Sequence, residues 1–257
     1  MFNTYVINLP EHKQRFLAQS HSLEHLGIRP IRVQAYRYEH ITDAEIQRHI
    51  HGHAHHFMPR STIGCVYSHM KALEMFVNED PHEVALILED DAYPKLSEIN
   101  HVLNEYDGVW DAIFLHCDGD CPKSTSEAHA LSGSAAAYFI NKNGARKLLE
   151  HKWSGHYDSE SNKIPGFKKI VIGENAFWTD EKATMSKAEE SVNRIKSSSC
   201  EAIFGDWKLY ERGEKTLCHS LGYKRFRIPL IGYEVTNLDI IILFVFVFGF
   251  FIRRFKK

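Results

Sequence analysis

Two observations predict an α/β fold built on a parallel sheet. Residues 4–9 form an apolar, strand-like run, an amphipathic helix follows from Pro10 and Glu11 to about Leu26, and residues 31–35 resemble a second strand. A strand, a helix and a strand at this spacing form a βαβ unit, in which the strands are parallel. Residues 84–88 are the second observation, because an apolar run without helical spacing is typical of a strand buried on both faces.

Composition places the chain among globular proteins and excludes some functions. The chain has 257 residues, 44% of them apolar, which supports a sizeable core. A net charge of −2 argues against nucleic-acid binding, which requires a basic face. Five cysteines, odd in number and scattered, argue against a disulfide framework and favour a reducing compartment. No signal peptide precedes the first strand, so we expect a cytoplasmic protein or one at the cytoplasmic face of a membrane.

Three acids follow the buried strand directly: Glu89, Asp90 and Asp91. Ligands of open α/β sheets bind outside the carboxyl ends of the strands, so these acids are expected at the mouth of a site. Unpaired buried charge is costly, and a divalent cation such as Mg²⁺ or Mn²⁺ would hold the carboxylates together. The competing interpretation is that the acids form a helix N-cap. The triplet by itself supports the two interpretations about equally.

Other polar residues lie where a nucleotide could bind. Asn8 ends the first strand and Arg15 lies in the following helix, although a turn Asn and a solvated Arg would look the same. A helix through about Asn78 carries Ser68 and His69 near its start, with Thr62 as its expected cap. A Ser-His pair without a third member is weak support for nucleophilic catalysis, and a satisfied core histidine is the simpler interpretation of His69.

The remaining elements are less regular. Residues 36–59 are polar and rich in histidine, which indicates either a metal-binding tract or, more commonly, an exposed loop or helix end. Further strands are expected at residues 110–116 and 131–140, a turn at Asn143 and Gly144, and helices at residues 96–106 and 145–151. Residues 153–200 read as irregular, and residues 201–230 show no clear pattern.

The C-terminal tail differs from the rest of the chain. Residues 240–252 carry no polar side chain and precede a basic end, which divides the chain into a main domain at 1–228 and a tail at 229–257. A spanning helix needs roughly 20 apolar residues. The tail is therefore expected to associate with a membrane, as a short C-terminal anchor or as a segment lying in the interface, or else to pack as a terminal strand or helix.

Four motifs in order resemble glycosyltransferase family 25. This family includes bacterial lipooligosaccharide galactosyltransferases and collagen galactosyltransferases, and the resemblance covers roughly residues 3–200. The motifs are Tyr-Val-Ile-Asn-Leu at 5–9 with Arg15, Ile-Gly-Cys-Val-Tyr-Ser-His at 63–69, Leu-Ile-Leu-Glu-Asp-Asp-Ala at 86–92, and Gly-Ser-Ala-Ala-Ala-Tyr-Phe-Ile at 133–140 ahead of Gly-Ala-Arg-Lys-Leu-Leu at 144–149.

The resemblance implies a GT-A-type α/β/α sandwich that uses a UDP-sugar and a divalent cation, Mn²⁺ or Mg²⁺. It makes the triplet the counterpart of the DXD motif, with Asp91 and Glu89 as metal ligands and His156 completing the shell. The same resemblance implies a donor pocket lined by the following residues: Asn8, Arg15, Ser68, His69, Glu89 and Asp90.

The implied reaction moves galactose or glucose to a glycan or glycoprotein acceptor with inversion. Inversion in one displacement needs a base for the acceptor hydroxyl, and Asp158 is the candidate, with Asp118 and Asp120 as rivals. Residues 153–200 lack the proline and acid landmarks of the family. This departure keeps open the alternative of an inactive nucleotide- or carbohydrate-binding module. A third hypothesis is a membrane-linked interaction protein in which the acids cap a helix.

Overall fold

The computed structural model describes residues 1–52, 54–56, 58–95, 99–105, 109–117, 126–127, 133–173, 176–179, 225–227, 234–236 and 244. The strands are β1 (Asn3–Asn8), β2 (Pro30–Gln34), β3 (Val84–Glu89), β4 (Ala92–Pro94), β5 (Ala112–Phe114), β6 (Ser126–Glu127), β7 (Ala137–Asn141), β8 (Lys169–Val171), β9 (Phe177–Thr179), β10 (Arg225–Arg227) and β11 (Glu234–Thr236). The helices are α1 (Lys13–Glu24), α2 (Asp43–His49), α3 (Arg60–Glu79), α4 (Ile99–Glu105), α5 (Lys142–Glu150) and α6 (Tyr157–Glu160), with short 3-10 turns at Tyr38–His40, Ala54–His56 and Ser161–Lys163.

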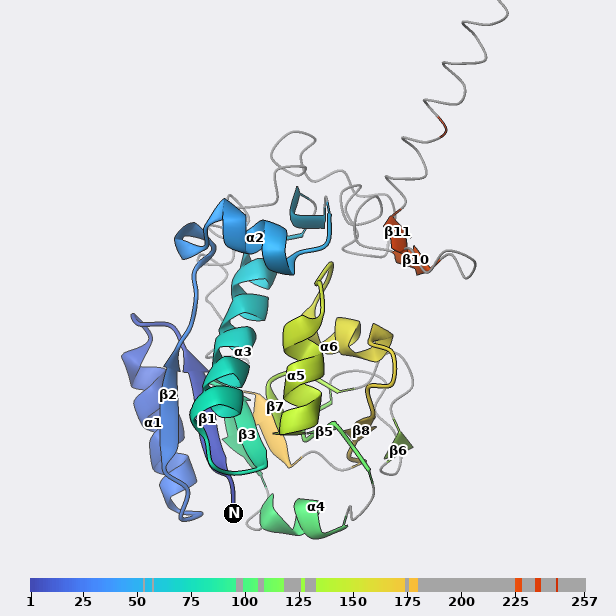
Figure 1. The fold of residues 1–257 in the computed structure, drawn as a ribbon. Helices are drawn as coiled ribbons and strands as arrows, with labels where there is room; N and C mark the ends of the chain where they lie inside the picture. The colour runs from blue at the N-terminus through green and yellow to red at the C-terminus, as the bar shows by residue number, and fades with distance from the viewer. Residues whose placement is uncertain are drawn as a thin grey trace, which may run out of the picture.

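A seven-stranded sheet in the order β2-β1-β3-β7-β5-β8-β6 forms the centre of the described structure (Figure 1). Strand β1 pairs in parallel with β2 and β3, and β5 pairs in parallel with β8. Strand β7 runs antiparallel between β3 and β5, and β6 runs antiparallel to β8. Strands β1, β2, β3, β5 and β8 therefore share one direction, which confirms the α/β fold with a mostly parallel sheet.

Helices cover both faces of this sheet. Successive residues of a strand face opposite sides, so a strand that is apolar throughout presents an apolar surface to each layer of helices. On one face, Ile87 of β3 lies in the same buried cluster as Leu73 of α3 and Leu148 of α5. On the other face, Leu86 of β3 shares a cluster with Leu23 of α1. Helices α3 and α5 lie side by side over their face, as Figure 1 shows. The two buried clusters give the layers of an α/β/α sandwich.

Helix α3 is fastened to the segment that follows β2. A Cβ atom on Gly64 would lie 2.9 Å from the backbone oxygen of Tyr36, so only glycine permits this approach. One turn later, the hydroxyl of Ser68 accepts a hydrogen bond from the Tyr36 amide at 2.8 Å and donates to the Gly64 carbonyl at 2.6 Å. These contacts fix the distance between α3 and the segment that follows β2.

Two local predictions are wrong. Helix α3 begins at Arg60 after Pro59, so Thr62 is not its cap but a buried residue of the first turn. The turn expected at Asn143 and Gly144 is the first part of α5, whose N-cap is Asn141. The glycine serves packing there, since a Cβ on Gly144 would lie 2.5 Å from the backbone oxygen of Asp111.

Two stretches are more regular than expected. Within residues 36–59, Thr42 and Glu45 form a capping box that starts α2. His49 ends that helix, in line with the expectation of a helix end. Within residues 153–179, which were read as irregular, the structure contains α6, β8 and β9.

Asp118, Asp120 and the apolar run at residues 240–252 lie outside the described residues, apart from Phe244. In the part of the chain that is described, no helix has the length and apolar character needed to cross a bilayer. Cys117, which follows β5, is disulfide-bonded, so the expectation of reduced cysteines is wrong at this position.

Candidate functional site

The acidic triplet lies in a turn between two strands. Glu89 is the last residue of β3, Asp90 and Asp91 form the turn, and β4 starts at Ala92. Because a strand and not a helix follows, the alternative of a helix N-cap is wrong. The turn follows the carboxyl end of β3, beside the end of β1, where ligands of such sheets bind. We call Glu89, Asp90 and Asp91 together the acidic turn.

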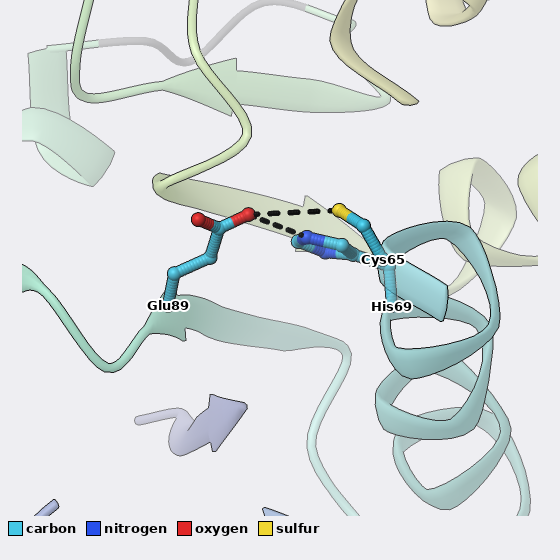
Figure 2. A group of neighbouring side chains, drawn as sticks. All are labelled: Cys65, His69 and Glu89. Atoms are coloured by element: carbon cyan, nitrogen blue, oxygen red, sulfur yellow. Dashed lines mark hydrogen bonds and ion pairs between the residues drawn. The ribbon is translucent and has the colours of Figure 1, made fainter. Parts of the chain in front are cut away.

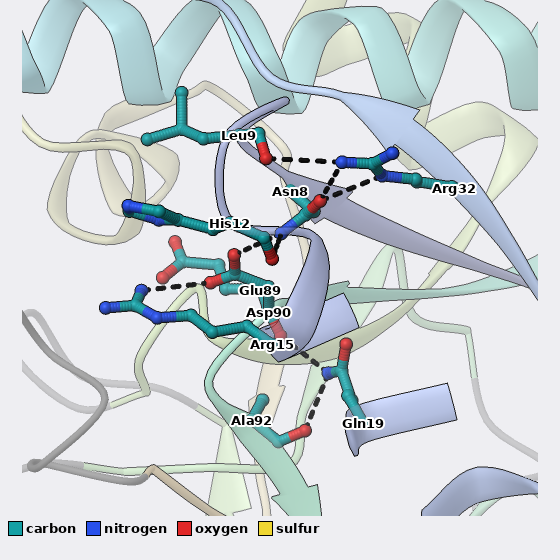
Figure 3. Close-up of polar contacts among 9 residues, drawn as sticks. All are labelled: Asn8, Leu9, His12, Arg15, Gln19, Arg32, Glu89, Asp90 and Ala92. Atoms are coloured by element: carbon teal, nitrogen blue, oxygen red, sulfur yellow. Dashed lines mark hydrogen bonds and ion pairs between the residues drawn. The ribbon is translucent and has the colours of Figure 1, made fainter. Parts of the chain in front are cut away.

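Asp90 faces the N-terminal βαβ unit (Figure 3). The Asn8 amide donates to Asp90 Oδ2 at 2.6 Å, and Arg15 lies 3.4 Å from Asp90 Oδ1. The same amide donates to the backbone oxygen of His12 at 2.9 Å, and its oxygen accepts from Arg32 Nε at 2.8 Å. The buried Asn8 side chain is thus fully engaged within the protein, and it positions Asp90 and Arg32.

Gln19 holds the acidic turn through hydrogen bonds to its backbone, as Figure 3 shows. Its buried side-chain amide donates to the backbone oxygens of Glu89 at 2.6 Å and Ala92 at 2.7 Å. Sequence reasoning missed Gln19 and Arg32. The available signal was slight: Gln19 follows Arg15 by one helical turn, so the two residues share a face of α1.

Glu89 points to the opposite side of the sheet, toward α3 (Figure 2). Its Oε1 atom lies 3.1 Å from His69 Nε2 and 3.8 Å from Cys65 Sγ. The fully buried His69 ring also places Nδ1 3.0 Å from the Tyr138 hydroxyl and stacks on Tyr157 with ring centroids 4.3 Å apart. The strand's alternation therefore separates the first two acids, and each has its own set of partners.

Asp91 carries charge that its described surroundings do not balance. Its Oδ1 atom is buried without a hydrogen-bond partner among the described residues. Burial, followed by the negative charges of Glu89 and Asp90, raises the pKa of Asp91 from 3.8 to about 7, against the opposing effect of Arg15. An orphaned carboxylate oxygen beside two further acids fits a divalent cation, for which Glu89 and Asp91 supply hard oxygen ligands.

The other predicted site residues lie on α3 and α6. Ser68 is buried and its hydroxyl bonds the backbone, so it positions α3. His156 is the exposed N-cap residue of α6, and Asp158 follows it in that helix. The Asp158 carboxylate contributes, after burial and Glu89, to raising the pKa of the Cys65 thiol, which places it near the α3 side of the site. Sequence reasoning considered only the backbone of Gly64 and Cys65, as a place for a phosphate, and gave the Cys65 thiol no role.

A buried lysine lies next to Asp158. Lys169 of β8 donates a hydrogen bond from Nζ to the Asp158 backbone oxygen at 3.0 Å. The same Nζ atom lies 4.0 Å from the centre of the Phe114 ring. Burial lowers the pKa of Lys169 to about 8, while the charge of Asp158 acts in the opposite direction. No motif marked this residue in the sequence.

Solved structures with a similar arrangement include two glycosyltransferases. A glycosyltransferase involved in glycosylation of the major capsid of PBCV-1 is 14% identical, with a TM-score of 0.43 over 76% of this chain and 98% of that one. The Drosophila β-1,4-galactosyltransferase 7, in a mutant complex with manganese, UDP-Gal and xylobiose, is 9% identical, with a TM-score of 0.40 over 92% of each chain. Values this low transfer no function. No curated protein matches the sequence.

The sequence comparison is more specific. Residues 1–115 match the family model described as glycosyltransferase family 25 (LPS biosynthesis protein). This range contains β1, α3, β3 and the acidic turn, together with Asn8, Arg15 and His69. His156 and Asp158 lie beyond it. The matched residues make up just under half of the chain, and they hold three of the four motifs that indicated this family.

Proposed function

We propose that this protein is a metal-dependent glycosyltransferase that moves a hexose, galactose or glucose, from a UDP-sugar to a glycan or glycoprotein acceptor with inversion. The observation that carries the proposal is the acidic turn: three carboxyl groups at the carboxyl end of β3, inside the family-matched residues, with the Asp91 oxygen unpartnered among the described residues. Residues 229–257 remain a proposed membrane-associating tail at the cytoplasmic face.

Glu89 and Asp91 are the proposed ligands of Mn²⁺ or Mg²⁺, with His156 as a third. A bound divalent cation offsets the negative charge that grows on the UDP leaving group. Asp90 has a different part, because it is held by Asn8 and Arg15. Its role is to set the position of Arg15, whose guanidinium supplies positive charge for a phosphate at this edge.

Transfer breaks the bond between the sugar C1 atom and the β-phosphate oxygen and forms a bond from C1 to the acceptor oxygen. UDP leaves with the electron pair of the broken bond, and the acceptor hydroxyl gives up its proton. Asp158 is the proposed base that takes this proton. Its position in α6, near the α3 side of the site, supports this role.

A panel of UDP-sugars, with a GDP-sugar as a control, tests the function. Mn²⁺-dependent release of UDP should appear with UDP-galactose or UDP-glucose, and Asp91→Asn should remove it while the folded protein remains. The control is Asp43→Asn, an exposed acid of α2, which should leave the rate unchanged. Tight UDP binding without any release of sugar would instead favour an inactive nucleotide-binding module.

A second assay separates the base from the metal ligands. Asp158→Asn should lower kcat strongly and leave Mn²⁺-dependent UDP binding intact, since the proton acceptor is not needed to hold the nucleotide. If Asp158→Asn retains the full rate with the acceptor, another residue is the base.

A further inference from the structure

One group of three side chains combines sulfur, nitrogen and oxygen ligands at the α3 side of the site. The Cys65 Sγ atom, a ring nitrogen of His69 and a carboxylate oxygen of Glu89 all lie within 4.8 Å of one another, and Figure 2 shows all three side chains converging. His69 is buried, Cys65 is largely covered, and Glu89 is one-third exposed. Among the described residues, no other group of His, Cys, Asp and Glu side chains has this geometry.

The backbone of α3 and β3 places these three ligands. Cys65 and His69 are four residues apart on α3, so their side chains lie on the same face of the helix, one turn apart. Glu89 ends β3 and points to the same face of the sheet as Ile87, the face covered by α3. Two rigid elements thus fix the three ligand atoms.

Aromatic side chains hold the His69 ring in place. Its Nδ1 atom lies 3.0 Å from the Tyr138 hydroxyl, which in turn bonds the Tyr157 hydroxyl at 3.0 Å. When the Tyr138 oxygen accepts the Nδ1 proton, Nε2 presents a lone pair toward Glu89 Oε1. Two acceptors 3.1 Å apart need a shared cation between them, either a proton or a metal ion. A partner on the second ring nitrogen is typical of metal-binding histidines.

We propose that Cys65, His69 and Glu89 bind a Zn²⁺-class cation, distinct from the oxygen-ligated Mn²⁺ or Mg²⁺ proposed at Asp91. Zn²⁺ takes sulfur at about 2.3 Å and nitrogen or oxygen at about 2.0–2.2 Å, so tetrahedral geometry puts the ligand atoms about 3.3–3.6 Å apart. The observed separations of 3.1 and 3.8 Å from Glu89 Oε1 need little adjustment. A thiolate ligand favours Zn²⁺ over Mg²⁺ or Mn²⁺, which prefer oxygen.

Three protein ligands leave a fourth coordination position for water or for an oxygen of a bound molecule. Glu89 is shared between this site and the acidic turn, and its side chain is one-third exposed. The site does not depend on sugar transfer, because the three ligands bind a cation whether or not a UDP-sugar is the substrate.

Cobalt absorption tests the proposal directly, because Co²⁺ occupies zinc sites and gives a charge-transfer band when a thiolate ligates it. Titration of Co²⁺ into the chelator-treated full chain should produce this band, and Zn²⁺ should displace Co²⁺ and bleach it. Cys65→Ser and Cys65→Ala should remove the band. Tyr138→Phe should keep the band but weaken Co²⁺ binding by about 10-fold or more, the usual effect of losing a partner of a ligating histidine.

Two further measurements keep the test decisive. In the unmodified protein, Zn²⁺ should slow alkylation of Cys65, measured by the mass of its peptide, so the result does not depend on a folded variant. Asp91→Asn should retain the cobalt–thiolate band even if it loses sugar transfer, which separates this site from the proposed function. No band, a band that survives in both Cys65 variants, or alkylation unaffected by Zn²⁺ would overturn the proposal.

Discussion

The Gln19 amide nitrogen lies 2.6 Å from the backbone oxygen of Glu89 and 2.7 Å from that of Ala92. One buried side chain of α1 thus joins Glu89, the first residue of the acidic turn, to Ala92, the residue that follows the turn. A donor between two carbonyl oxygens is required here, because an oxygen in its place would face two acceptors. The position of the turn relative to α1, and so to Arg15, depends on this amide.

Gln19→Glu should therefore destabilise the protein in a pH-dependent way. At pH 8 the new carboxylate faces two carbonyl oxygens, and leaving buried acceptors unpaired costs about 1–3 kcal/mol. At low pH the protonated carboxyl can donate once, so the loss should shrink. Urea unfolding at pH 5 and pH 8 measures this, with the exposed Gln14→Glu of the same helix as control. Equal losses of unfolding free energy for Gln19→Glu and Gln14→Glu would show that the Gln19 amide does not hold the turn in place.

Asp91→Asn should stabilise the metal-free protein at high pH. A carboxyl whose pKa is raised from 3.8 to about 7 contributes stability below its ordinary pKa and loses it as the pH rises through 7. At pH 8 the variant should unfold a few degrees higher than the original chain, about the effect of 1–2 kcal/mol for this size. At pH 4 the two should coincide.

Thermal unfolding at both pH values, with and without Mn²⁺, checks this expectation. Adding Mn²⁺ at pH 8 should raise the melting temperature of the original chain and close the gap to Asp91→Asn. A gap that is the same at pH 4 and pH 8 would mean that the carboxylate is already balanced by a partner, and the metal assignment would fail with it.

The parts of the fold that could be predicted are those encoded by local patterns. The apolar runs gave β1, β2 and β3, and the helical spacing gave α1 and α3. The direction of β7 could not be predicted, because parallel and antiparallel strands have the same alternation when both faces are buried. Short strands such as β8 and β9 are stabilised by pairing with distant residues, so their own sequence shows little.

The same division applies to the site. The acids were visible because charge at the end of an apolar strand is unusual. The different surroundings of Glu89 and Asp90 depend on which helix covers which face, and this is a property of the whole sheet. Gln19, Arg32 and Cys65 act on residues far away in the sequence, so no local spacing marks them.

Gly64→Ala should destabilise the protein although it places a better helix former inside α3. Alanine is favoured over glycine in a helix interior by about 1 kcal/mol. The new Cβ would lie 2.9 Å from the Tyr36 backbone oxygen, and overpacking costs about 1–3 kcal/mol. We expect a net loss, because the obstacle is backbone and cannot change rotamer.

Chemical denaturation of Gly64→Ala beside Ser61→Ala, an exposed change in the first turn of α3, measures this difference. Ser61→Ala should fall within about 0.5 kcal/mol of the original chain. A more stable Gly64→Ala would show that α3 can move away from Tyr36 at no cost, and that this contact does not fix the distance between α3 and the segment that follows β2.

The loss of stability caused by Lys169→Met should grow as the pH rises from neutral to alkaline. Burial lowers the pKa of Lys169 from 10.5 to about 8, so the folded state prefers the neutral amine. Between pH 8 and 10.5 the unfolded chain binds the extra proton, and the original chain therefore gains stability as the pH rises through this window. The methionine variant has no such gain in stability, and it also lacks the hydrogen bond to the Asp158 backbone oxygen. The stability of the original chain relative to the variant should rise by about 2–3 kcal/mol from pH 7 to pH 10.

Paired urea titrations at pH 7 and pH 10 measure this rise, and the exposed neighbour Lys168→Met is the control, for which no rise is expected. A slope as flat as that of the control would place the Lys169 amine in water.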